Sequence, residues 1–177
     1  TNVGFAGGCN CGAMGATGNN ICFLNSDAMV KPGVLEKFEA VLMNGQVGAT
    51  GPYSNQAKEP QGRHQESQGI KEVNTLSGFC LAMNRGLFNT LGGFDTQFCN
   101  FEDDDLCKRI KLIGLKLVIA DTWVMHQENT SFKANNAPVN TKIEQSRKLY
   151  RAKWPKIRVI ALTHNEANSL PGFVEQF

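Results

Sequence analysis

Apolar residues recur along the 177-residue chain with two periods, one typical of strands and the other of helices. Short apolar runs with polar borders predict buried strands, at residues 20–24, 46–50, 73–83, 115–120, 122–126 and 157–162. Apolar residues three or four positions apart predict helices, at residues 7–18, 34–42, 85–91, 102–113 and 141–154. Strands that alternate with helices indicate an α/β layered fold with a mostly parallel sheet and flanking helices.

Two segments carry neither period. Residues 51–72 contain Gly, Pro, Gln and Ser throughout, which predicts a long and mobile loop. Residues 127–140 are polar and read as a linker. The chain begins at Thr1 rather than Met and stops at Phe177 within an amphipathic pattern, so we expect it to be a fragment of a longer protein.

Composition narrows the class of protein. Hydrophobic residues at 41% and charged residues at 19% are ordinary for a globular protein. A net charge of +2 is too small to predict nucleic acid binding, and no apolar run approaches the ~20 residues that span a bilayer. The six cysteines form no Cys-x-x-Cys pair and no zinc spacing, which favours a reducing compartment, most simply the cytoplasm. Peripheral attachment to a membrane through the rest of a longer protein stays open.

Four consecutive carboxylates, Glu102 to Asp105, open the predicted helix at residues 102–113. The positive end of the helix dipole stabilises such acids as anions, and an ionised carboxylate at a cleft can accept a proton from a substrate hydroxyl. Ordinary helix capping accounts for one or two acids. Because four in a row repel one another, the run favours a functional site. Lys108 and Arg109 are expected to be solvated helix charges.

Asp27 and His126 each follow an apolar run, where the end of a strand is expected. Ligands of α/β sheets bind beyond the carboxyl ends of strands. Alone, each residue is more typical of a turn or of an exposed strand end. Together they could share a divalent cation with a diphosphate. Trp123 and Trp154 are expected to pack in the protein, although either could form the floor of a sugar site.

Several segments, taken in order, resemble the inverting glycosyltransferases of family 2, which have the GT-A fold, and in particular their rhamnosyltransferase-like branch. The resemblance covers residues 1–133 and is carried by Asn2-Val3-Gly4-Phe5-Ala6-Gly7-Gly8-Cys9-Asn10, Phe23-Leu24-Asn25-Ser26-Asp27, Ser77-Gly78-Phe79, Gly92-Gly93-Phe94-Asp95, Phe101-Glu102-Asp103-Asp104-Asp105-Leu106 and His126. The first of these also resembles a loop that cradles phosphate before a helix.

The resemblance implies a role for each matching residue. Asp103 would be the general base of a single displacement with inversion, and Glu102 beside it would bind acceptor hydroxyls in the catalytic site. Asp27 and His126 would hold Mn or Mg, and Asn25 stands where the family often has a further acid. The resemblance further implies contacts to the nucleotide-sugar donor at Asn25, Asn2, Gly8 and Asn10, and contacts to the acceptor at Ser77, Gly78, Phe79 and Asp104.

The same resemblance implies the substrates and the domain organisation. The donor would be a nucleotide-diphosphate sugar and the acceptor a glycan, a lipid-linked molecule or a protein, as in polysaccharide biosynthesis. Residues 1–133 would form the C-terminal two-thirds of a GT-A domain, which is thus incomplete at its N-terminal half, and residues 134–155 a linker and a basic helix. Residues 156–177 would begin a second such domain, or supply a strand that completes the sheet by folding back or in a strand-swapped dimer.

A second function stays open beside the transferase. The chain could be a catalytically silent module that binds a glycan or a partner through the same cleft. A structural calcium site at the acidic run is disfavoured, because the residues around Asp103 lack the EF-hand pattern.

Overall fold

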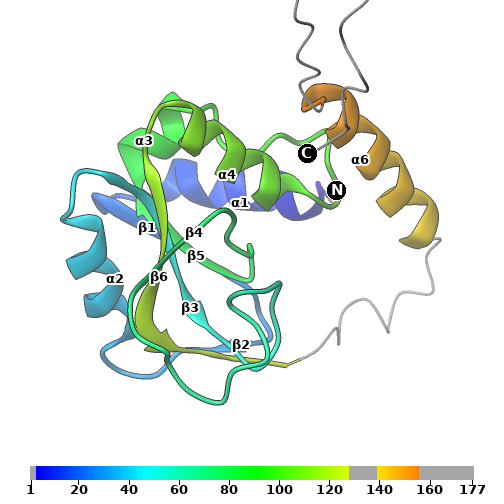
Figure 1. Cartoon of the computed structure of the whole chain (residues 1–177). Coiled ribbons are helices and arrows are strands. Elements are labelled where there is room, and N and C mark those ends of the chain that lie inside the picture. Colours follow the sequence, from blue (N-terminus) through cyan, green and yellow to red (C-terminus); the bar gives the residue numbers. More distant parts are fainter. Residues whose placement is uncertain (1–2, 128–138, 156–177) are drawn as a thin grey trace, which may run out of the picture.

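A computed structural model describes residues 3–127 and 139–155, in which helices flank a central sheet (Figure 1). The sheet has five strands in the order β1-β5-β3-β6-β4, and β2 and β7 form a separate pair. The strands are β1 (Asn20–Leu24), β2 (Ala28–Met29), β3 (Val47–Tyr53), β4 (Lys71–Val73), β5 (Cys80–Asn84), β6 (Lys116–Trp123) and β7 (Met125–His126). The helices are α1 (Gly4–Gly15), α2 (Val34–Leu42), α3 (Arg85–Thr90), α4 (Glu102–Leu112) and α6 (Val139–Lys153).

The predicted α/β class with flanking helices is confirmed, but the sheet is mixed rather than mostly parallel. Among the described strands of this sheet, only β3 and β6 pair in parallel. β5 runs antiparallel to both β1 and β3, and β4 runs antiparallel to β6. A parallel neighbour needs a crossover, usually a helix. No helix lies between β3 and β5, so β4 and β5 return in the direction opposite to β3.

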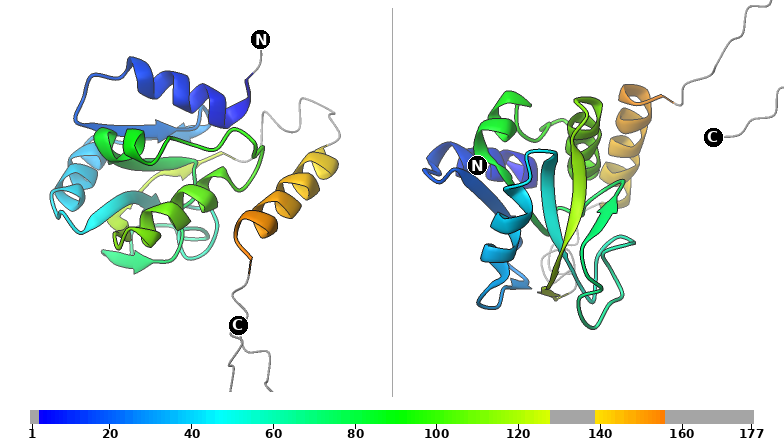
Figure 2. Two further views of the ribbon diagram at one scale, coloured as in Figure 1. Left: turned by 90° about the horizontal axis from the view of Figure 1, so that it is seen from above. Right: turned by 60° about the vertical axis from the view of Figure 1, so that its left-hand side comes forward.

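Alternate side chains of the strands point to opposite faces of the sheet, and each face builds its own core. On one face α2 places Val34 and Phe38 over a cluster that includes Cys80, Ala82 and Ala120. The other face is covered by α1, α3 and α4, with a core that includes Phe23, Leu81, Met83, Phe88, Leu106, Ile110, Leu117 and Ile119. Figure 2 shows the two helical layers on either side of the strands.

Several predicted segments have different boundaries in the structure. The helix predicted at residues 7–18 is α1, which begins at Gly4, and the strands predicted at residues 115–120 and 122–126 are β6, which continues to Trp123, and the short β7. The strand expected at residues 73–83 is two strands, since β4 ends at Val73 and β5 begins at Cys80. The loop expected at residues 51–72 is shorter, because β3 extends to Tyr53 and β4 begins at Lys71. Between them Gln61 is only 1% exposed. Its side chain donates to the Pro52 carbonyl and accepts from the Ser77 amide, so residues 54–64 are held in place rather than loose.

The basic helix predicted at residues 141–154 is α6, and its C-terminal end docks on α4. Lys153 Nζ and Trp154 Nε1 contact Asp105 Oδ1 at 2.8 and 2.9 Å, and Asp105 is fully buried. Arg109 completes the cluster with contacts of 2.8 and 2.9 Å to Asp105 Oδ2. Arg109 is therefore a half-buried partner of Asp105 and not the solvated charge that the sequence predicted, whereas Lys108 is exposed. Figure 2 shows α6 lying along the outer side of α4.

The proposed domain boundaries stay predictions. Residues 156–177, with their predicted strand, lie outside the described residues, as does Asn2. None of the helices in the described ranges is long and apolar enough to cross a bilayer.

The Asp105 cluster predicts a large loss of stability on removal of its carboxylate charge. Asp105→Asn would leave Arg109 and Lys153 next to a neutral amide, and we expect the free energy of unfolding to fall by about 3 kcal/mol. Urea denaturation followed by circular dichroism measures the change. Asp121→Asn, at a half-exposed carboxylate, is the control and should change stability by less than about 1 kcal/mol. A similar small change in both variants would contradict the prediction.

Candidate active site

The four acids at the start of α4 are aimed in different directions by the backbone. Phe101, which precedes them, has a φ of 77°, in the left-handed region that costs a non-glycine residue roughly 1–3 kcal/mol. The ring of Tyr150 from α6 stacks on Phe101 at 5.5 Å between centroids and supports this conformation. Successive helical residues are about 100° apart, so neighbouring acids meet different partners.

Asp103 lies at the centre of the site and is only 7% exposed. Its Oδ2 accepts the backbone N–H of Gly78 at 2.9 Å, and its Oδ1 accepts the N–H of Asp104 at 2.9 Å. Lys58 Nζ lies 2.9 Å from Oδ1 and 3.1 Å from Oδ2. A Cβ on Gly78 would lie 3.3 Å from the Cβ of Asp103, so a glycine at this position gives the carboxylate close access to the backbone.

Lys58 bridges two of the acids. Besides Asp103, its Nζ contacts Asp104 Oδ2 at 2.8 Å, while Asp104 Oδ1 accepts a hydrogen bond of 2.7 Å from Thr75. Burial by itself would lower the pKa of Lys58, but the carboxylates of Asp103 and Asp104 outweigh it and raise that pKa above its ordinary value. The ammonium therefore stays charged and offsets the repulsion between the two carboxylates.

Glu102 behaves differently from its neighbours. Burial, together with the negative charge of Asp103, raises the pKa of Glu102 to about 7. Its Oε2 is buried and makes no hydrogen bond with any residue in the described ranges. A buried oxygen of this kind is expected to have a partner, so it suits a ligand hydroxyl or a water molecule.

Asp27 and His126 meet, as the sequence predicted. β2 and β7 pair antiparallel with Ala28 opposite His126, which places Asp27 Oδ1 3.2 Å from His126 Nε2. His126 Nδ1 lies 2.8 Å from the Gln56 carbonyl oxygen, which can only accept, so Nδ1 carries a proton. In the neutral ring Nε2 then turns a lone pair toward the carboxylate. Two such electron-rich atoms at 3.2 Å require a proton or a cation between them.

These two residues fit a divalent cation that is also bound by a substrate. An imidazole nitrogen and a carboxylate oxygen suit Mn²⁺, and their separation of 3.2 Å is close to the roughly 3 Å between neighbouring ligands of one octahedral ion. Among the described residues no group of three or more His, Cys, Asp and Glu is placed to hold a metal. A cation here would therefore need oxygen ligands from a diphosphate or from water.

Residues 54–64, between β3 and β4, join the Asp27–His126 pair to the acidic helix. The Asn55 side chain exchanges two hydrogen bonds with the backbone of His126, at 2.9 and 3.0 Å. Gln56 accepts from the imidazole of His126, and Lys58, two residues later, reaches Asp103 and Asp104. One short segment thus fixes both halves of the site.

The segment Ser77-Gly78-Phe79 makes a second connection. The ring of Phe79 stacks on His126 at 4.6 Å, and its carbonyl accepts the N–H of Asn25 at 2.8 Å. Gly78 donates to Asp103, as described above. Asp27, His126 and Asp103 are therefore linked through Phe79 and Gly78. That the three residues serve one functional site stays a prediction.

The residues expected to contact the donor are more scattered. Asn25 lies beside Phe79 at the end of β1, close to Asp27. Gly8 is exposed on α1. The side chain of Asn10 exchanges two hydrogen bonds with the backbone of Phe94, at 2.8 and 2.9 Å, so it fastens α1 to the segment before α4. The role of Gly8 and Asn10 in donor binding stays a prediction.

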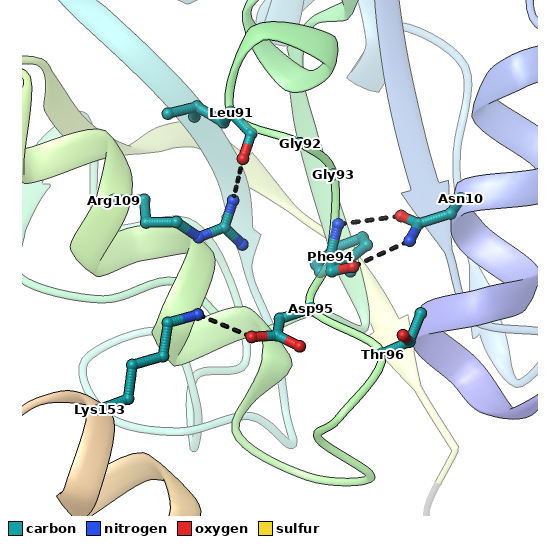
Figure 3. A pocket seen from close by; sticks show the side chains of 9 residues that line it. All are labelled: Asn10, Leu91, Gly92, Gly93, Phe94, Asp95, Thr96, Arg109 and Lys153. Carbon is teal, nitrogen blue, oxygen red and sulfur yellow. Dashed lines mark hydrogen bonds and ion pairs between the residues drawn. The ribbon is translucent and has the colours of Figure 1, made fainter.

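A separate hollow of about 360 Å³ lies between α1, α4 and α6 (Figure 3). It is lined by Asn10, Leu91, Gly92, Gly93, Phe94, Asp95, Thr96, Arg109 and Lys153. Most of its polar groups are already engaged with one another: Lys153 pairs with Asp95 at 2.7 Å, and Arg109 donates to the Leu91 carbonyl at 2.7 Å. The Gly92–Asp95 motif therefore holds helices together at this hollow, and Asp103 is not among the residues that line it.

Sequence reasoning missed the site residues Asn55, Gln56, Lys58 and Gln61. They lie in a polar stretch without periodicity, and their side chains have partners up to 71 positions away in the chain. Only their side-chain chemistry was visible beforehand. Nothing in the local pattern distinguished them from loop residues in contact with solvent.

The fold is that of GT-A glycosyltransferases. No protein-family model and no curated protein matches the chain. Among solved structures it is similar to GalNAc-T7 with UDP, GalNAc and Mn²⁺, with a TM-score of 0.59 and 17% identity over 70% of this chain and 30% of that one. It is also similar to the mannosyltransferase PcManGT from Pyrobaculum calidifontis in complex with GDP-Man and Mn²⁺, with a TM-score of 0.55 and 17% identity over 87% of this chain and 56% of that one.

The raised pKa of Glu102 predicts a pH-dependent gain in stability for Glu102→Gln. Because the folded-state pKa of about 7 lies above the unfolded value, the contribution of Glu102 is fully present below about pH 4 and is lost as the pH rises through 7. We expect Glu102→Gln to match the original chain near pH 4 and to exceed its stability by up to ~3 kcal/mol at pH 8. Urea denaturation at both pH values measures this. An equal difference at the two pH values would contradict it.

Proposed function

We propose that the chain is the acceptor- and metal-binding part of an inverting glycosyltransferase that uses a nucleotide-diphosphate sugar. The observation that carries the proposal is the continuous set of contacts from Asp27 and His126 to Asp103, within a GT-A fold. Both solved structures compared above contain Mn²⁺ and a nucleotide or nucleotide sugar, which supports this class of donor and cofactor. The chain spans only 30% and 56% of their lengths, so the activity of a longer protein is proposed here.

In the proposed reaction Asp103 is the general base. Its carboxylate takes the proton of an acceptor hydroxyl while the oxygen attacks the anomeric carbon from the face opposite the diphosphate. Gly78 N–H holds the carboxylate in place, and the unpaired Oε2 of Glu102 offers an acceptor for a neighbouring hydroxyl. A divalent cation held by Asp27 and His126 would stabilise the negative charge of the departing diphosphate. Inversion at the sugar follows from the single displacement.

The finer assignment, to family 2 and its rhamnosyltransferase-like branch in polysaccharide biosynthesis, rests on the sequence resemblance. Ser77, Gly78, Phe79 and Asp104 would border the acceptor, which is a glycan, a lipid-linked molecule or a protein. We also keep a second candidate, a catalytically silent module that binds a glycan. It is favoured by one observation, the ion pair through which Lys58 covers the carboxylate of Asp103.

The base assignment predicts a loss of turnover without a loss of donor binding. Asp103→Asn keeps the size of the side chain but removes its basicity, so nucleotide release from GDP-mannose or a UDP-sugar in the presence of a glycan acceptor should fall by roughly 10²–10⁴. Calorimetric binding of GDP or UDP with Mn²⁺ should change little. Asp121→Asn is the control. Undiminished release by Asp103→Asn would sink the assignment, and glycan binding without nucleotide binding would favour the silent module.

The assignment of Asp27 and His126 as metal ligands predicts a loss of nucleotide binding. His126→Gln removes one of the two proposed ligands, so Mn²⁺-dependent binding of GDP or UDP should weaken by about tenfold or more. Binding measured with EDTA instead of Mn²⁺ should be equally weak in the original chain and in the variant. His64→Gln, at a histidine that contacts the Pro60 carbonyl rather than Asp27, is the control. If His126→Gln binds nucleotide as tightly as the control, the cation is held elsewhere.

A further inference from the structure

Asp103 has no room for a substrate hydroxyl in the structure described above. A carboxylate offers about four lone-pair positions to hydrogen-bond donors. The N–H groups of Gly78 and Asp104 take one position on each oxygen of Asp103, and Lys58 Nζ contacts both oxygens at 2.9 and 3.1 Å. All the positions are thus engaged. A hydroxyl that is to give its proton to Asp103 must first displace one of these donors.

Lys58 is the donor that can leave. The N–H groups of Gly78 and Asp104 belong to the backbone, one in the buried segment before β5 and one in the first turn of α4. The Lys58 side chain is 43% exposed, and four rotatable bonds separate its ammonium from the backbone. Lys58 would also retain a charged partner, because Asp104 Oδ2 already lies 2.8 Å from Nζ. Moving off Asp103 would cost one ion pair and leave the other intact.

We propose that Lys58 occupies the position of the acceptor hydroxyl on Asp103, and that it keeps the base from activating water until an acceptor displaces it. This inference rests on the proposed function, since it assigns Asp103 as the base. Lys58 acts through Asp103 and is a positioning residue, not a catalytic one. Thr75 holds Asp104 from the other side at 2.7 Å, so the second anchor for the ammonium is itself fixed.

The reaction that Lys58 would suppress is hydrolysis of the donor. The oxygen of a water molecule would attack the anomeric carbon, and its proton would pass to Asp103. The bond from that carbon to the diphosphate oxygen would break, releasing free sugar and nucleoside diphosphate. Water is small and abundant, so a base open to solvent would waste donor in this way. An acceptor gains further contacts at Glu102 and around Ser77 to Phe79, which can offset the ion pair that it breaks.

The test compares acceptor-free hydrolysis among variants at this position. Lys58→Met removes the ammonium but keeps the length of the side chain, and Lys58→Arg keeps a cation. With Mn²⁺ and either GDP-mannose or UDP-N-acetylgalactosamine, release of nucleoside diphosphate by Lys58→Met should rise by up to roughly fivefold, the largest factor by which one half-exposed ion pair favours the closed arrangement. Lys58→Arg should stay near the original rate.

Lys116→Met is the matched control. Lys116 pairs with Glu72 at 3.1 Å, and its side chain is 47% exposed, which is close to the 43% of Lys58, but it lies on β6 among residues outside the site. Hydrolysis by Lys116→Met should equal that of the original chain. Addition of Asp103→Asn to Lys58→Met should remove the increase in hydrolysis, because that hydrolysis requires Asp103 as the base.

Each outcome decides a different point. Faster hydrolysis in Lys58→Met than in the original chain, Lys58→Arg and Lys116→Met supports the inference. This includes the case in which the original chain shows no hydrolysis. Equal or slower hydrolysis in Lys58→Met, with Asp103→Asn still inactive, overturns the role of Lys58 and leaves the proposed function standing. If Lys58→Met hydrolyses the donor equally well with and without the added Asp103→Asn change, Asp103 is not the base. Both proposals are then overturned. Absence of hydrolysis in every variant, although nucleotide binds, overturns the role of Lys58, and the proposed function is then decided by transfer to an acceptor in the original chain and in Asp103→Asn.

Discussion

The site depends on how one buried carboxylate is surrounded. Asp103 sits where three segments meet that are distant in sequence: the segment before β5, the loop after β3 and the first turn of α4. A carboxylate taken out of water needs donors on both oxygens, or its burial opposes folding. Those donors fix where Gly78 and Lys58 must lie, and their neighbours Phe79 and Gln56 in turn hold His126. Satisfying one charge therefore sets the geometry between the base and the proposed metal ligands.

The sequence predicted most of the fold because hydrophobic period is a local signal. β1 is Asn20–Leu24, as expected, and α3 and α4 begin where their predicted helices begin. The direction of strands is not local. Whether β5 runs with or against β3 depends on how the chain returns between them, and that path is stabilised by buried Gln61 and by contacts of residues 54–64 with His126. The hydrophobic period of the sequence does not reveal hydrogen bonds that polar side chains make with distant residues.

The candidate site residues also differ in whether a local sequence pattern marks them or only long-range contacts do. Asp27, His126 and Asp103 could be found from the sequence because each stands at the border of a periodic element, where ligands of α/β folds bind. Lys58 and Asn55 could not, since their importance comes only from what the fold brings next to them. Arg109 is intermediate. Its spacing of four from Asp105 fits a helical ion pair, but Lys153 of α6, which shares Asp105 with it, lies 44 residues later in the chain.

The acidic run also shows why four adjacent carboxylates can be tolerated. Asp105 is neutralised by Arg109 and Lys153 on the side of α6, and Asp103 and Asp104 share Lys58 on the side of the loop. Burial raises the pKa of Glu102 to about 7, so near neutral pH it carries less negative charge than an ordinary glutamate. Repulsion within the run is thus much smaller than the sequence suggests. What distinguishes the four acids is the direction in which each leaves the helix, and among the contacts of the described residues only Asp103 combines a backbone donor from another segment with a half-exposed cation.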